Sequence, residues 1–511
     1  MSDNQNSAVY FVDRHLNEGR GDKIVYQEAV ELKRSMTYSQ LAEGSDRVHG
    51  ALSRLGIRRE ERAAMIVLDQ IEFPQIFWGS IKAGVVPILL NTLLSASVYE
   101  AILRDSRAAI LFVSAELLAT VLPAFEHCPD LREIVVIGGD GYPSTLSWDA
   151  FMADAPAVPA VGACADEVAF WLYSSGSTGT PKGVRHVHGS LRATAETYGS
   201  EVLGIRETDT VFSVAKMFFA YGLGNAMTFP LSVGATTILL SARPTPDSVS
   251  AILEAYRPTV YCGVPTLYAA LLHHWEKQGS HPQAPIRRCI SAGEALPAEI
   301  GRKWKDIWEI DILDGVGSTE MLHIFLSNRD NNLHYGSSGI AVPGYELRLV
   351  DEAGADVAEG QVGELLVRGP SAAEGYWNQR EKSRRTFEGE WTRTGDKYES
   401  LGEGRFVYCG RTDDMFKVSG IWVSPFEIEQ ALIAHPDVLE AAVVSKRDDE
   451  GLEKPKAFVV LKSGNVAADD LKEFVKSKIG KWKYPRWIEV VTELPKTATG
   501  KIQRFKLRDV A

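Results

Sequence analysis

Residues 168–183 read VAFWLYSSGSTGTPKG and join an apolar run to a loop rich in glycine, serine and threonine. The apolar run is typical of a buried strand. Glycines let the backbone approach a polyanion, hydroxyls can donate hydrogen bonds, and Lys182 can add a positive charge. A Walker A loop is excluded, because Pro181 and Gly183 stand where it requires Gly and Ser or Thr. The position directly after a strand favours a phosphate loop over a flexible linker.

Strand and helix patterns alternate along the first half of the chain. Apolar runs predict strands, and the segments between them have helical periodicity. This alternation predicts parallel sheets covered by helices. Strands are expected at 63–68, 85–89, 109–113 and 133–137, with helices at 38–55, 72–83 and 115–125; a second strand series is expected at 209–215, 236–240, 259–262, 288–291 and 311–315.

After Tyr335 the pattern changes to short β-rich segments, and residues 410–414 (GRTDD) resemble a boundary. The last hundred residues predict a compact α+β unit of domain size. The predicted fold class is therefore α/β. We expect a large N-terminal domain, 1–411, of helix-covered β-sheets with a β-rich subdomain, followed by a small mobile α+β C-terminal domain, 412–511.

The composition is that of a large globular protein, with 511 residues, 45% hydrophobic and 24% charged. A formal net charge of −12 argues against general nucleic-acid binding, which needs a basic surface. Five isolated cysteines indicate neither a disulfide framework nor a zinc site. The longest apolar run, 83–90, is far shorter than the roughly 18 residues of a membrane span, and the polar N-terminus lacks a signal-peptide pattern. We expect a cytoplasmic protein without a membrane partner.

Four further motifs follow the glycine-rich loop in order: 314–320 (DGVGSTE), 394–396 (TGD), 410–420 (GRTDDMFKVSG) and 495–501 (PKTATGK). Together they closely resemble the motifs of the adenylate-forming enzymes, which include acyl- and aryl-CoA synthetases, firefly luciferase and peptide-synthetase adenylation domains. The resemblance covers nearly the whole chain. The segments MFFAYGLGNAMTFP, GSTEMLHIFLSN and SGIWVSPFEIE are similar to those of benzoate– and 4-hydroxybenzoate–CoA ligases.

The resemblance implies two half-reactions. A carboxylate attacks the α-phosphate of MgATP to give acyl-AMP and pyrophosphate, and the thiol of coenzyme A then displaces AMP. The implied cofactors and co-substrates are ATP, Mg²⁺ and coenzyme A. We expect ligation of benzoate to coenzyme A, with 4-hydroxybenzoate as the alternative acid, by a monomer or homodimer without a nucleic-acid partner.

The family motifs imply roles for individual residues. Lys501 matches the adenylation lysine, whose ammonium can bridge the carboxylate and the α-phosphate. Glu320 resembles the magnesium ligand, and Thr319 would hydrogen-bond the α-phosphate. The other implied ATP and AMP contacts are Ser174, Ser175, Gly176, Ser177, Thr178, Gly179, Lys182, Gly293, Glu294 and Asp314, with Asp396 and Arg411 at the ribose.

The aryl-acid pocket is expected from two of the segments quoted above. Small residues would leave room for a flat ring, apolar ones would enclose it, and Phe219 matches the gate toward the thiol tunnel. A buried 4-hydroxyl would need a polar partner, which His323 can supply. The flanking Leu322 and Ile324 resemble the benzoate enzymes more closely, which favours benzoate. The predicted lining is Phe219, Ala220, Tyr221, Gly317, His323 and Ile324.

Asp413 matches the family hinge, where a large backbone change between two domain orientations is absorbed. One orientation would bring Lys501 to ATP. The other would bring in the coenzyme A tunnel, for which the resemblance implies Lys417, Ser419 and Gly420. Gly420 has no side chain and would let the pantetheine arm pass.

Two other functions remain open at this stage. One is an adenylation enzyme that loads a carrier protein, which the absence of a carrier segment after Ala511 disfavours. The other is a non-ligating nucleotide-binding protein or ATP hydrolase, which would release ADP and phosphate rather than AMP and pyrophosphate. The pairs His186/His188 and His273/His274 have no third ligand at a supporting spacing, so we expect no histidine metal site.

Overall fold

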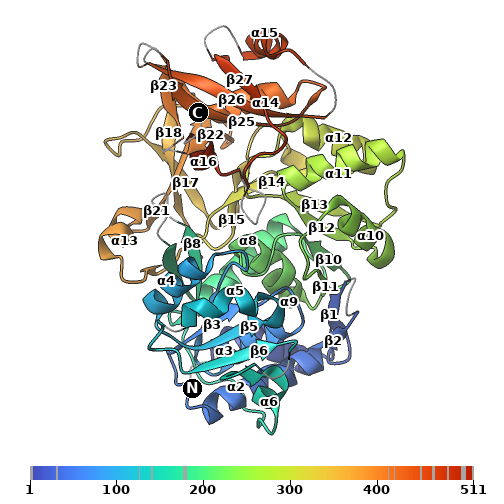
Figure 1. Cartoon of the computed structure of the whole chain (residues 1–511), viewed down its shortest axis with the longest axis vertical. Coiled ribbons are helices and arrows are strands. Elements are labelled where there is room, and N and C mark those ends of the chain that lie inside the picture. Colours follow the sequence, from blue (N-terminus) through green and yellow to red (C-terminus); the bar gives the residue numbers. More distant parts are fainter. Residues whose placement is uncertain are drawn as a thin grey trace.

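The computed structural model places helix-covered sheets at one end and a smaller α+β unit at the other (Figure 1). It describes residues 4–29, 33–125, 127–139, 142–175, 181–411, 414–418, 421–448, 452–462, 466–479, 483–496 and 502–508. No helix within these ranges is long and apolar enough to cross a membrane.

The first sheet carries the glycine-rich loop and has the strand order β19-β9-β8-β4-β3-β5-β6-β7. Its central strands pair in parallel and are buried on both faces, which explains their continuous apolar runs. The first four predicted strands are thereby confirmed. The strands are β3 (Arg62–Ile66), β4 (Val86–Leu89), β5 (Ala108–Ser114), β6 (Glu133–Ile137), β7 (Leu146–Ser147), β8 (Val168–Ser175), β9 (Pro181–Val187) and β19 (Gly375–Tyr376).

The three helices that periodicity predicts, at 38–55, 72–83 and 115–125, are confirmed, and further helices occur in this part of the chain. The helix Tyr38–Arg54 begins with a capping box, in which the Thr37 hydroxyl accepts from the Gln40 N–H and the Gln40 side chain accepts from the Thr37 N–H. The helical elements of this part are η1 (Val9–Asp13), α1 (Arg14–Asn17), α2 (Tyr38–Arg54), α3 (Glu72–Lys82), α4 (Ala96–Ser106), α5 (Ala115–Phe125) and α6 (Trp148–Met152).

The second sheet has the order β16-β15-β14-β13-β12-β10-β11-β1-β2, with β10 to β14 in parallel. The second predicted strand series is confirmed. Its strands are β1 (Ile24–Glu28), β2 (Ser35–Thr37), β10 (Thr210–Ser213), β11 (Thr236–Leu239), β12 (Val260–Gly263), β13 (Arg288–Ser291), β14 (Ile312–Gly317), β15 (Ile324–Ser327) and β16 (Ile340–Ala341). The helices of this part are α7 (His188–Thr194), η2 (Ala195–Val202), α8 (Ala220–Leu223), η3 (Gly224–Thr228), α9 (Phe229–Val233), α10 (Pro246–Tyr256), α11 (Pro265–Gln278) and α12 (Ala298–Trp308).

One buried core joins the two sheets. Phe77 and Phe170 belong to the first sheet and its helices, Leu313 and Phe325 to the second, and all lie in the same cluster of buried side chains. Because a shared core resists relative movement, the loops at the carboxyl ends of both strand series are held in a common frame.

A third, antiparallel sheet forms the β-rich part that the change of pattern after Tyr335 predicts. Its order is β17-β18-β21-β20, and β22 pairs with β21. The elements here are η4 (Asp330–Asn332), β17 (Glu346–Val350), β18 (Val362–Arg368), α13 (Arg380–Thr386), β20 (Phe387–Glu388), β21 (Trp391–Ser400) and β22 (Phe406–Arg411).

The C-terminal unit, orange to red in Figure 1, has its own buried core, which includes Phe416, Ile428 and Val459. A separate core is the mark of a separate folding unit, and the predicted fold class is confirmed. The short α16 is absent from the sequence prediction. The elements are β23 (Phe416–Val418), β24 (Ile421–Val423), α14 (Pro425–Ile433), β25 (Val438–Arg447), β26 (Glu453–Leu461), α15 (Ala468–Ile479), β27 (Trp487–Val490) and α16 (Arg504–Arg508).

Candidate active site

The glycine-rich loop connects two antiparallel strands, because β8 and β9 pair up to Ser174↔Lys182 and Ser175↔Pro181. The hydroxyl of Ser174 is buried and has no hydrogen-bond partner among the described residues. An unsatisfied hydroxyl at the base of the loop fits a site that a phosphate oxygen would complete. Gly176, Ser177, Thr178 and Gly179 lie outside the described residues, and only the backbone of Ser175 is described.

Lys182, Glu320 and Tyr376 form a compact charged cluster beside this loop. The Lys182 ammonium lies 2.6 Å from Glu320 Oε1 and 2.9 Å from the Tyr376 hydroxyl. The Tyr376 hydroxyl in turn donates to Glu320 Oε1 over 2.8 Å. Burial raises the pKa of Glu320, but the Lys182 ammonium outweighs it and leaves that pKa below its usual value. Glu320 is therefore an ionised, oriented carboxylate.

Tyr376 is the residue that the sequence reasoning missed. It lies on β19, which pairs with β9 across the register Tyr376↔Val184, and this pairing brings it to Lys182. Burial, followed by the charge of Glu320, raises the pKa of Tyr376, so its hydroxyl remains a donor. No local pattern around residue 376 predicts this meeting.

Thr319 is held by the neighbouring strand. His186 on β9 is buried, which lowers its pKa to about 4, and its Nε2 lies 2.8 Å from the Thr319 carbonyl oxygen. A carbonyl can only accept, so the neutral ring carries its proton on Nε2. His186 therefore positions the DGVGSTE segment. The described residues contain no group of three or more His, Cys, Asp and Glu arranged to hold a metal.

Asp396 and Arg411 face each other on the antiparallel strands β21 and β22. Arg411 Nη1 lies 3.0 Å from Asp396 Oδ1, and the Asp396 charge raises the pKa of Arg411. The charge of Glu320 acts on Arg411 in the same direction. The predicted ribose pair thus lies within electrostatic reach of the Lys182 cluster.

The predicted adenine-side residues follow β13 and lie on β14. Gly293 has φ +97°, a left-handed backbone that glycine adopts without strain. Asp314 Oδ2 accepts the Leu296 N–H over 3.2 Å, and burial raises the pKa of Asp314 to about 8. Glu294 Oε1 accepts the N–H of Ile502 over 2.8 Å. Glu294 therefore contacts the C-terminal unit directly.

The structure brings the two predicted aryl segments together. Phe219 is the N-cap residue of α8, and Tyr221 lies on that helix. The carbonyl oxygen of Tyr221 accepts a hydrogen bond from His323 Nε2 over 3.3 Å. Burial lowers the pKa of His323 to about 3, so the ring is neutral. Gly317 pairs with Ile324 across β14 and β15. A Cβ at Gly317 would lie 2.5 Å from the His323 carbonyl oxygen, so glycine is required by this close backbone approach.

His323 lies among aromatic rings at the end of the aryl segments. Its ring centroid is 4.5 Å from that of Phe229 and 5.1 Å from that of Tyr198. The ring Nδ1 is buried and has no hydrogen-bond partner among the described residues. Because Nε2 donates to Tyr221, Nδ1 is an acceptor. Ala220 is half-buried in the first turn of α8.

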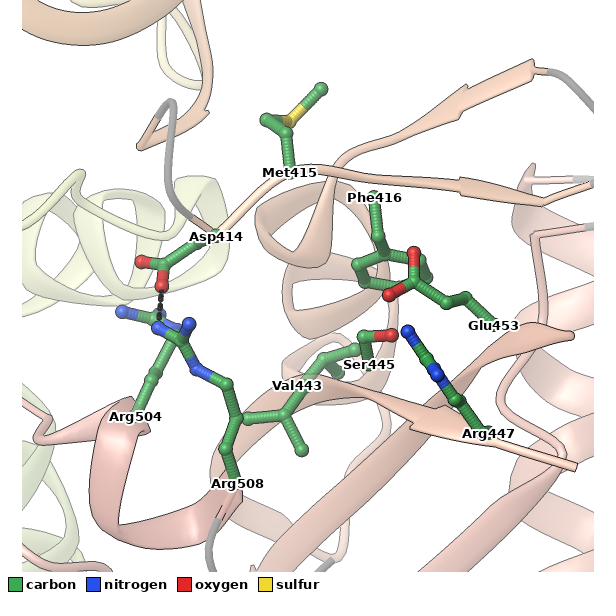
Figure 2. Close-up of a pocket in the computed structure, with 10 residues that line it drawn as sticks. Asp414, Met415, Phe416, Val443, Ser445, Arg447, Glu453, Arg504 and Arg508 are labelled. Atoms are coloured by element: carbon green, nitrogen blue, oxygen red, sulfur yellow. Dashed lines mark hydrogen bonds and ion pairs between the residues drawn. The ribbon is translucent and has the colours of Figure 1, made fainter. Parts of the chain in front are cut away.

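Contacts on either side of the predicted hinge belong to different units. Arg411 pairs with Asp396 in the N-terminal part, whereas Asp414 pairs with Arg508 on α16 of the C-terminal unit (Figure 2). Asp414 also lines a pocket of about 230 Å³ between the start of β23, strands β25 and β26, and α16. Asp413, Ser419, Gly420 and Lys501 lie outside the described residues, as does the side chain of Lys417.

Residues 13–377 match the family of AMP-binding enzymes, and residues 427–501 match the AMP-binding enzyme C-terminal domain. The chain is 53% identical to a benzoate–CoA ligase of Thauera aromatica, over 98% of this chain and 95% of that protein. It is 51% identical to a 4-hydroxybenzoate–CoA/benzoate–CoA ligase of Rhodopseudomonas palustris, over 99% and 94%. The crystal structure of a benzoate CoA ligase from Burkholderia xenovorans LB400 superimposes with a TM-score of 0.89 at 48% identity, over 98% of this chain and 99% of that one.

These similarities extend over nearly the whole chain and therefore over both units. The resemblance to adenylate-forming enzymes, and to benzoate– and 4-hydroxybenzoate–CoA ligases among them, is confirmed. The chain belongs to the AMP-binding enzyme family.

Proposed function

We propose that the protein ligates benzoate to coenzyme A, using ATP and releasing AMP and pyrophosphate through an enzyme-bound aryl-AMP. The observation that carries this proposal is full-length identity above one half to two proteins whose names both include benzoate–CoA ligase. The charged cluster of Lys182, Glu320 and Tyr376 supplies the matching chemistry, because it offers a cation and an oriented carboxylate beside a phosphate loop.

The donors in this cluster fit a magnesium ion that arrives with ATP. Mg²⁺ prefers oxygen ligands and is usually held by one or two carboxylates together with substrate phosphates. Glu320 is an ionised carboxylate whose position is set by Tyr376. Glu320 would hold the ion, which when bound would neutralise phosphate charge. Lys182, paired to Glu320 at present, would then turn to a phosphate oxygen.

The remaining residues orient the two reactants. Asp396 would accept hydrogen bonds from the ribose hydroxyls, with Arg411 beside it. Thr319, held through its carbonyl by His186, would donate to the α-phosphate. Lys501 would bring its ammonium to the carboxylate and the α-phosphate, stabilising the charge that develops as they react. The thiol of coenzyme A would then attack the aryl-AMP carbonyl and release AMP.

The proposed domains are 1–411 and 412–511, with a hinge near Asp413. Two ion pairs support this division, because Arg411 pairs within the first domain and Asp414 within the second. Coenzyme A would pass Lys417, Ser419 and Gly420 after the C-terminal domain turns. Cytoplasmic location and a monomeric or homodimeric state stay predictions, in keeping with ATP and coenzyme A as co-substrates.

The choice between benzoate and 4-hydroxybenzoate centres on His323. Its Nδ1 has no hydrogen-bond partner among the described residues and can accept a hydrogen bond from a ring hydroxyl, whereas the Tyr221 hydroxyl donates to the Gly263 carbonyl over 3.1 Å. Because a buried acceptor without a donor costs on the order of 1–3 kcal/mol, 4-hydroxybenzoate is the alternative substrate. Benzoate remains first because Leu322 and Ile324 resemble those of the benzoate enzymes.

A pyrophosphate-release assay with and without coenzyme A tests the function. The acids are benzoate, 4-hydroxybenzoate, 2-aminobenzoate, cyclohexanecarboxylate and a medium-chain fatty acid. We expect benzoate to give the highest kcat/KM, with AMP and aryl-CoA as products. A preference for the fatty acid contradicts the aryl pocket. Release of ADP and phosphate supports a non-ligating ATPase, and transfer only to a carrier protein supports a carrier-loading enzyme.

A further inference from the structure

Glu294 makes a direct hydrogen bond from the N-terminal part to the loop that carries Lys501. Its Oε1 accepts the backbone N–H of Ile502 over 2.8 Å, although the two residues are 208 positions apart. Ile502 is covalently bonded to Lys501, so this contact acts one residue from the predicted adenylation lysine. The donor is a backbone N–H, which does not depend on the side chain at position 502. The side chain that determines this hydrogen bond is therefore that of Glu294.

The base of the Lys501 loop is secured inside the C-terminal unit. Lys496 and Ile502 form an antiparallel bridge, and the Gln503 N–H donates to the Pro495 carbonyl over 2.8 Å. Arg504 forms a two-point pair with Glu429, at 2.7 Å and 3.1 Å. The outgoing end of the loop therefore moves with the C-terminal unit, so a hydrogen bond at Ile502 acts on the whole unit.

The charge of Glu294 also reaches this unit. Burial lowers the pKa of Arg504, but Glu429 and then Glu294 outweigh it and raise that pKa above its ordinary value. A second hydrogen bond lies nearby, from the Ala298 N–H at the start of α12 to the Gln430 side chain on α14 over 3.3 Å. Glu294 makes the shorter contact and the one next to Lys501.

We infer that Glu294 is a positioning residue for adenylation: its hydrogen bond holds Ile502, the residue after Lys501, against the N-terminal part in this domain orientation and releases it when coenzyme A reacts. This inference rests on the proposed two-step function, and it gives Glu294 a task other than contact with adenine. Because the contact must break before the second orientation forms, its loss should affect the first half-reaction alone.

The first experiment measures hydrogen exchange at the Ile502 amide, with overlapping peptides, in the ligand-free full-length protein. We expect protection in the wild type, loss of protection in Glu294→Ala, and retention of much of it in Glu294→Gln, whose amide oxygen can still accept. Glu299→Gln is the matched control, because this half-buried acid on α12 pairs with Arg302 and Lys303 of its own helix. An unprotected wild-type amide, or equal protection in Glu294→Ala, overturns the inference.

The second experiment separates the half-reactions. Glu294→Ala should slow aryl-AMP formation about 10- to 100-fold, as expected for loss of a hydrogen bond to a charged group, and Glu294→Gln should recover most of that loss. Thioester formation from supplied aryl-AMP and coenzyme A should stay within about twofold of the wild type. An equal loss in both steps, or a matching loss of AMP affinity, overturns the positioning role. If the wild type activates no aryl acid, the proposed function fails, while the exchange experiment still decides the docking contact.

Discussion

The cluster of Lys182, Glu320 and Tyr376 and the contact between the two units differ in whether their polar groups belong to one folding unit or to two. Glu320 is held at one oxygen by both Lys182 and Tyr376, inside a part of the fold that shares one core. Glu294 and Gln430 instead lie on different units, and each accepts a backbone N–H of the other unit. Buried partners within one unit keep their geometry, whereas a hydrogen bond between two units, worth about 1–3 kcal/mol net when one partner is charged, can be exchanged when the units move. The Lys182 cluster is therefore prearranged, whereas the contact between the units can be broken and remade.

Lys501→Ala tests the predicted adenylation lysine, which precedes Ile502 in the sequence. We expect at least about a 100-fold loss of aryl-AMP formation, because the cation that stabilises the developing charge is removed. Thioester formation from supplied aryl-AMP should be nearly unchanged. The measurement is single-turnover pyrophosphate release, with Lys506→Ala, an exposed lysine on α16, as the control. Equal loss of both steps would contradict two domain orientations.

Tyr376→Phe weakens the prearranged side. The substitution keeps the ring under the Lys182 ammonium, which lies 4.4 Å from the ring centroid, and removes the donor to Glu320. We expect ATP affinity in the presence of Mg²⁺ to fall about tenfold, measured by titration calorimetry. Tyr142→Phe, at a more exposed tyrosine, is the control. Unchanged affinity would show that Glu320 is oriented without Tyr376.

Asp314→Asn tests a buried carboxyl at the adenine side through pH. The pKa of Asp314 is raised from 3.8 to about 8 by burial, so between these values the folded chain keeps a proton that the unfolded chain has lost. Folding is therefore penalised increasingly as pH rises through this window. Asn removes the penalty, and we expect a gain of about 1–3 kcal/mol at pH 8 and a smaller gain at pH 5, with weaker AMP binding. Thermal unfolding at the two pH values measures it, and a larger gain at pH 5 would refute the assignment.

Arg508→Gln should have the smallest effect. Its pair with Asp414 lies next to the predicted hinge, but the Arg508 side chain is 40% exposed. Solvent screening limits such a pair to less than about 1 kcal/mol of stability. Urea unfolding measures this, with Arg504→Gln for comparison, since Arg504 and Glu429 are both largely buried and should cost more. A loss in Arg508→Gln as large as in Arg504→Gln would mean that the hinge flank is as rigid as the core.

Much of the fold was predictable because its signals are local. Buried parallel strands need continuous apolar runs, so β3 to β6 stand out in the sequence. α2 was predictable to within a residue, since its periodicity ends near Arg54. The short α16 was not, because a helix of one turn carries too little periodicity to detect.

The candidate site likewise has residues that the sequence predicts and residues that it does not. The order of the five motifs along the chain was enough to indicate the AMP-binding family and to name Lys182, Glu320, Asp396 and Arg411. Only the tertiary structure decided that Tyr376 meets Lys182 across 194 residues and that Glu294 meets Ile502 across 208. Motifs are local because a loop or strand end is built from neighbours in sequence. Partners such as Tyr376 and Glu294 depend on strand register and domain docking, which are set by the packing of the whole chain.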